Sequence, residues 1–204
     1  MRAAPKRAGE IAIGSGVALL AGPTGADAHL VTSGLGPVYD GLLHLLVTPE
    51  NLIGVVALAL LAGARGVVHG RRALFVLPAA WMVGGIVGLA VHGRVSLALM
   101  PLSFVLLGGL VAADVRLSVS VMTALAALLG LGHGYLDGAT MDQPGLGASA
   151  LLGSVAAVFG LVALTASLVV TLQTGWPRIV VRVAGSWIAA IGLLLLGWGF
   201  RPGA

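Results

Sequence analysis

Six long apolar stretches follow one another along the chain, with short polar connections between them. They cover residues 42–64, 73–92, 95–113, 117–136, 148–172 and 183–200. An α-helix needs about 20 apolar residues to cross the hydrocarbon core of a bilayer, and each stretch approaches or exceeds that length. The pattern therefore predicts an all-α fold, a polytopic bundle of six transmembrane helices surrounded by the lipid bilayer.

The first 28 residues have the three parts of a secretory signal peptide. Basic residues come first, a short apolar core follows, and residues 26–28 form an A-x-A cleavage motif. That core is too short to span a bilayer, which needs about 20 residues. We expect residues 1–28 to be removed, leaving residues 29–204 as a single transmembrane domain that begins at His29. An uncleaved membrane anchor is the alternative.

The composition supports a membrane protein and excludes several other classes. Apolar residues make up 58% of the chain, charged residues only 9%, and the mean hydropathy is +1.07. A soluble domain carries about 25% charged residues. The 11 Lys and Arg residues are scattered, so no nucleic-acid partner is expected. Because the chain has no cysteine, disulfides, thiolate metal sites and thiol catalysis are excluded.

The arginines in the connections predict the orientation. If the mature N-terminus is outside, only Arg94 and Arg201 lie outside, and six arginines lie inside: Arg65, Arg71, Arg72, Arg116, Arg178 and Arg182. This distribution follows the positive-inside rule, whereas the opposite orientation would violate it. We therefore expect a protein of the bacterial cytoplasmic membrane with both mature termini on the periplasmic or extracellular side.

Pairs of small residues four positions apart predict close helix packing. Between helices in lipid, such residues let the backbones approach one another. The pairs are Gly84 and Gly88, Gly108 and Ala112, Gly109 and Ala113, and Gly153 and Ala157.

The segment GLGHGYLDG, residues 130–138, carries the clearest polar pattern. His133 and Asp137 are one helical turn apart on the same face, and glycines border them. Ionisable groups inside a membrane are costly and usually functional. Imidazole nitrogen and carboxylate oxygen suit a divalent ion such as nickel, zinc or cobalt. A buried packing pair, with His133 bonded to Asp137, is the alternative.

Asp40 and His44 repeat this spacing in reverse order at the same predicted membrane face. Thr48 and Pro49 then have the character of a helix start, with Thr48 as the N-cap. Residues 40–47 are therefore expected to form a short separate helix or half-helix, and breaks of this kind line ion sites in transporters. An interfacial turn with Asp40 in water is the alternative.

His29 is a further candidate ligand, because a mature N-terminus would offer an amine and an imidazole in one chelate. Within a flexible leader it would bind nothing. Met141 lies beside Asp142 near the predicted site, and a methionine sulfur is a ligand that suits copper. Copper therefore stays open as the bound metal.

These motifs resemble those of the HupE/UreJ family of bacterial membrane proteins. The resemblance covers the layout of the mature chain and, more specifically, HLVTSGLGPVYDGLLHLLVTPENL from His29 and GLGHGYLDG. In the family's first motif, a His and a Gly precede an adjacent Asp-His pair; here Gly41 and His44 match, and Asp40 supplies the acid. In its other motif, paired histidines precede an acid; here one histidine, His133, remains, and Asp137 stands near the place of the acid. The resemblance implies a nickel or cobalt permease.

The sequence thus predicts a permease rather than an enzyme, with Asp40, His44, His133 and Asp137 meeting in one site near the outer face. Two alternatives stay open: an intramembrane zinc-dependent hydrolase, and a structural or assembly subunit of a membrane complex. A separation of more than roughly 10 Å between the two pairs would favour the structural role. No prosthetic group is expected, and a homo-oligomer is compatible with the glycine-rich faces. The metal, the direction and the energy coupling of transport are not encoded in any motif.

Overall fold

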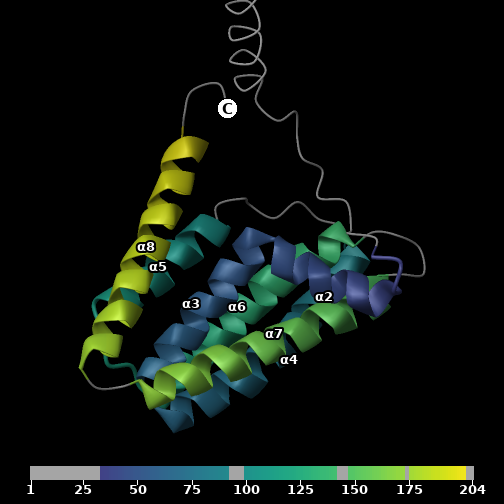
Figure 1. Ribbon diagram of the computed structural model, residues 1–204. Helices are drawn as coiled ribbons and strands as arrows, with labels where there is room; N and C mark the ends of the chain where they lie inside the picture. The colour runs from purple at the N-terminus through teal and green to yellow at the C-terminus, as the bar shows by residue number, and fades with distance from the viewer. Residues whose placement is uncertain (1–32, 92–98, 142–146, 173–174, 201–204) are drawn as a thin grey trace, which may run out of the picture.

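A computed structural model describes residues 33–91, 99–141, 147–172 and 175–200, and this part of the chain contains helices and no strands (Figure 1). The all-α fold class is therefore confirmed. The helices are α2 (Pro37–Val47), α3 (Pro49–Ala64), α4 (Val67–Val91), α5 (Leu99–Ala112), α6 (Val119–Thr140), α7 (Gly147–Thr171) and α8 (Trp176–Gly199). The predicted signal peptide, His29 and Asp142 lie outside the described residues.

Within the described ranges, four helices are long and apolar enough to cross a membrane, namely α4, α6, α7 and α8. The pair α2 and α3 makes a fifth candidate span if its two bent halves count as one. α5 has 14 residues in the described part of the chain, fewer than a full span needs. The described residues thus contain four or five candidate spans, and the sixth stays a prediction.

Like α2, which begins at Pro37 instead of residue 42, two more helices begin well before their predicted apolar stretches. α4 begins at Val67 instead of residue 73, and α8 begins at Trp176 instead of residue 183. Both added segments contain arginines, which favour helix and extend their charge away from apolar surroundings. Hydropathy detects only the apolar part of a helix, so it misses these polar first turns.

The first apolar stretch, residues 42–64, is not one straight helix. α2 and α3 meet at Thr48 with a bend of 75°, and Pro49 occupies the first turn of α3. The predicted half-helix and N-cap position are therefore present. The Thr48 side chain, however, does not cap α3; its hydroxyl donates a hydrogen bond of 2.6 Å to the carbonyl oxygen of His44. This bond holds Thr48, the residue at the break, against the last turn of α2.

α3 is at the centre of the bundle and contacts every other described helix (Figure 1). Around it, α4 packs on α6, α5 on α8, and α2 on α7. Glycines make these contacts close: a β-carbon at Gly84 would meet the backbone of Leu131, and one at Gly108 would meet the backbone of α8. Gly109 is an exception to the predicted pairs, because a β-carbon there would face open space.

Candidate functional site

Buried polar side chains gather where the α2–α3 break meets α6. The buried polar residues among those described are His44, Asn51, His133, Asp137 and Ser154. Their helices are mostly apolar, and a polar group in such surroundings is stable only with polar partners. The polar cluster is defined as six residues: His44, Asn51, His133, Asp137, Trp81 and Ser103.

Asp137 is the centre of this cluster. Its Oδ1 lies 3.6 Å from Nε2 of His44 and accepts a hydrogen bond of 3.3 Å from the Asn51 amide. Its Oδ2 accepts a hydrogen bond of 3.0 Å from the indole nitrogen of Trp81. The carboxylate is thus held by groups from α2, α3 and α4, although it is carried by α6.

His133 joins the cluster through Asn51. The Asn51 amide nitrogen faces Asp137, so its oxygen faces His133, and Nδ1 of His133 lies 3.4 Å from that oxygen. Nδ1 can donate a hydrogen bond to that oxygen in the tautomer that carries the proton on Nδ1. The other ring nitrogen, Nε2, lies 3.1 Å from the Ser103 hydroxyl on α5. The side chain of Asn51 thus connects the second histidine with the acid.

Asp40 lies apart from the cluster. Its carboxylate is on the first turn of α2, where it accepts hydrogen bonds from the backbone and the hydroxyl of Ser33, at 2.6 and 2.5 Å. The structure therefore brings His44 and Asp137 into direct contact and His133 close through Asn51, but gives Asp40 a separate local partner.

The family of the chain follows from a comparison with protein-family models. Residues 17–195 match the model described as HupE / UreJ protein, which is most of the chain. The chain belongs to the HupE/UreJ family. No match was found among the curated proteins or the solved structures. The HupE/UreJ family is associated with nickel and cobalt transport and is not an enzyme family.

Within the described part of this HupE/UreJ chain, no three His, Asp or Glu side chains are grouped closely enough to hold a metal ion by themselves. His44 and Asp137 supply two such donors, and the Asn51 side chain beside them turns its amide nitrogen toward Asp137 and its oxygen toward His133. Next to them, a cavity of about 190 Å³ between α5 and α6 reaches Ser103 and His133 and is otherwise lined by leucines.

Sequence reasoning missed Asn51, Trp81 and Ser103. Asn51 is the only asparagine of the chain and stands in an apolar stretch, which was a usable signal. Trp81 lies within an apolar stretch, but it is fully buried and its indole nitrogen is bonded to Asp137. Nothing in the local sequence marks Ser103, because only the packing of α5 brings it to His133.

Proposed function

We propose that this HupE/UreJ protein is a permease that moves nickel or cobalt across the bacterial cytoplasmic membrane through the polar cluster. Family membership supports metal transport in general. The observation that carries the proposed site is the buried contact of His44 with Asp137 at the α2–α3 break. A broken helix beside buried ionisable groups is a common arrangement for ion sites in transporters.

The geometry of the pair suits one shared ion. Imidazole nitrogen and carboxylate oxygen bind a first-row divalent metal at about 2.0–2.2 Å, so two ligands of one ion lie at most about 4.4 Å apart. His44 Nε2 and Asp137 Oδ1 are 3.6 Å apart, within that separation. The amide oxygen of Asn51 and water molecules would supply further ligands, all of them oxygen donors.

A small set of protein ligands favours transport over permanent binding. Conduction requires that an ion bind well enough to enter and weakly enough to leave. In the proposed cycle, the ion exchanges part of its water for His44 and Asp137, and His133 joins when Asn51 turns its oxygen toward the ion. The ion then passes between the helices to the other side.

The orientation belongs to the same proposal. The polar cluster would face the outer leaflet, and the arginine-rich end with Arg71 and Arg178 would face the cytoplasm. Single-cysteine labelling tests this cleanly, because the native chain has no cysteine. An impermeant reagent should label position 71 only from the cytoplasmic side. Labelling of position 71 from outside would show that the orientation is the opposite of the one proposed.

Metal uptake into proteoliposomes tests the site. With nickel, cobalt, copper and zinc offered separately, the wild type should accumulate nickel or cobalt, and Asp137→Asn should abolish that uptake. Asp40→Asn is the matched control, since it removes the same charge from a carboxylate outside the cluster. Normal uptake by Asp137→Asn, or equal loss in both variants, would contradict the proposed site.

A further inference from the structure

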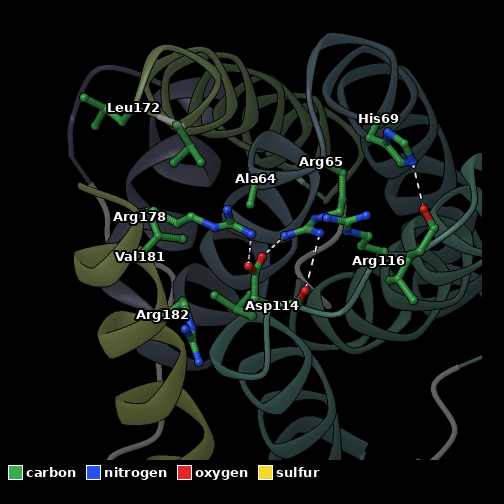
Figure 2. Close-up of a pocket in the computed structure, with 12 residues that line it drawn as sticks. Ala64, Arg65, His69, Asp114, Arg116, Leu172, Arg178, Val181 and Arg182 are labelled. Atoms are coloured by element: carbon green, nitrogen blue, oxygen red, sulfur yellow. Dashed lines mark hydrogen bonds and ion pairs between the residues drawn. The ribbon is translucent and has the colours of Figure 1, made fainter. Parts of the chain in front are cut away.

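A second polar site lies at the opposite end of the bundle. α3 begins beside the polar cluster and ends at Ala64, and the next residue, Arg65, lines a cavity of about 360 Å³ (Figure 2). Four arginines and one acid line this cavity, hereafter called the arginine cavity: Arg65, Arg116, Arg178, Arg182 and Asp114. Its charged groups therefore leave an excess of three positive charges when His69, which also lines it, is neutral.

Asp114 neutralises only part of this charge. Its carboxylate forms ion pairs with Arg65 and Arg178, which approach it from two sides (Figure 2). Arg182 uses its Nε to donate a hydrogen bond of 2.9 Å to the carbonyl oxygen of Ala112. Arg116 is exposed and makes no ion pair with any of the described residues. Several guanidinium donors thus stay available to a ligand.

The Nε atom of Arg65 is the most specific of these donors. The Arg65 side chain is only 9% exposed, and its Nε is buried without a hydrogen-bond partner among the described residues. Buried donors of charged groups are nearly always bonded, because leaving them unpaired is costly. A guanidinium group matches the oxygen atoms of a phosphate, which accept several N–H bonds at once.

We propose that the arginine cavity binds a phosphate group, carried by an anionic lipid headgroup or present as free inorganic phosphate. Arg65 forms the buried base of this site, and the exposed Arg116, Arg178 and Arg182 surround its entrance. The site is separate from the proposed metal site, because no residue is common to the two. Its charge also suits the surface of an anionic membrane leaflet.

Binding to the full-length protein in neutral detergent tests this proposal. The thermal unfolding midpoint is measured at low ionic strength with short-chain phosphatidylglycerol, with inorganic phosphate, and with sodium chloride at matched ionic strength. Arg116→Gln is the informative variant, because Arg65→Gln also breaks the ion pair with Asp114. Arg72→Gln is the matched control: it removes an exposed arginine from the first turns of α4, outside the cavity.

In the wild type, phosphatidylglycerol should raise the midpoint more than sodium chloride does. Arg116→Gln should weaken the apparent affinity roughly tenfold, while Arg72→Gln changes it by no more than about twofold. If inorganic phosphate gives the same stabilisation, free phosphate suffices; if only the lipid does, the headgroup is the ligand. Equal loss in both variants, or no stabilisation by either phosphate source, would overturn the proposal.

Discussion

Gly54 of α3 lies directly against the imidazole ring of His133. A β-carbon at residue 54 would come within 2.9 Å of Cε1 of that ring, closer than such atoms approach in proteins. The missing side chain therefore leaves the space that lets His133 reach Asn51 across the helix interface.

Gly54→Ala should reduce metal uptake roughly 10- to 100-fold, the range seen when groups that orient metal ligands are altered. The added methyl group would push the His133 ring away from Asn51. Transport assays in proteoliposomes measure this effect. Gly160→Ala on α7 is the control, because its β-carbon would face open space. Unchanged uptake in Gly54→Ala would show that the position of His133 is unimportant.

Trp81→Phe should destabilise the protein by about 1–3 kcal/mol, because a buried carboxylate loses one hydrogen-bond donor. The ring that packs against His133 is largely kept. Equilibrium unfolding in detergent measures the change. Trp187→Phe provides the comparison, since that side chain is 69% exposed on α8. Equal stability of the two variants would argue against a role for the indole N–H in holding Asp137.

Gly134→Ala and Gly132→Ala should differ sharply in stability although both lie on α6. A β-carbon at Gly134 would meet the backbone of Trp81, which cannot move aside, whereas at Gly132 it would meet only the end of the Leu99 side chain. Overpacking of this kind costs about 1–3 kcal/mol, so Gly134→Ala should unfold earlier in denaturant. Similar unfolding midpoints would mean that α4 and α6 are less tightly packed than described.

Asp114 should make stability depend on pH in the acid range. Burial alone would raise the pKa of Asp114, but hydrogen bonds from Arg178 and Arg65 and their positive charges outweigh it, so the pKa lies below the ordinary 3.8. The ionised carboxylate therefore stabilises the folded state above that value, and this contribution is lost as the pH falls through the lowered pKa.

The wild type should accordingly be more stable than Asp114→Asn at about pH 6, and the difference should shrink below about pH 4. Thermal unfolding midpoints of both proteins, measured over this range in the same detergent, give the comparison. A constant difference at every pH would show that the charge of Asp114 does not stabilise the fold.

The sequence predicted the features that depend on local pattern. Helical fold class, the break at Thr48 and the shared face of His133 and Asp137 all follow from residues close together in the chain. The partners of these residues could not be predicted in the same way. Asp40 and His44 lie one turn apart on α2. Only the packing of the helices determines that His44 contacts Asp137, whereas Asp40 accepts hydrogen bonds from Ser33.

The arginines show the same limit of sequence-based prediction: their positions along the chain were predictable, but the contacts between them were not. The alternation of predicted spans puts Arg65, Arg116, Arg178 and Arg182 at one end of the bundle, and all four line one cavity. The side of the membrane that this end faces stays a prediction. The common cavity of the four arginines arises from contacts between segments far apart in sequence. Asp114, held in a left-handed backbone conformation with φ of 54°, supplies the acid that joins two of them.

The central position of α3 has a mechanical consequence. Its first turn carries Asn51, and the residue that follows its last turn is Arg65, so one stiff rod of 16 residues connects the two polar sites. A rigid-body tilt that widens the space around Asn51 must also displace Arg65 relative to Asp114. α3 would then act as a lever: a change in packing around Asn51 at one end of the bundle would move Arg65 at the other end, without any separate relay of side chains.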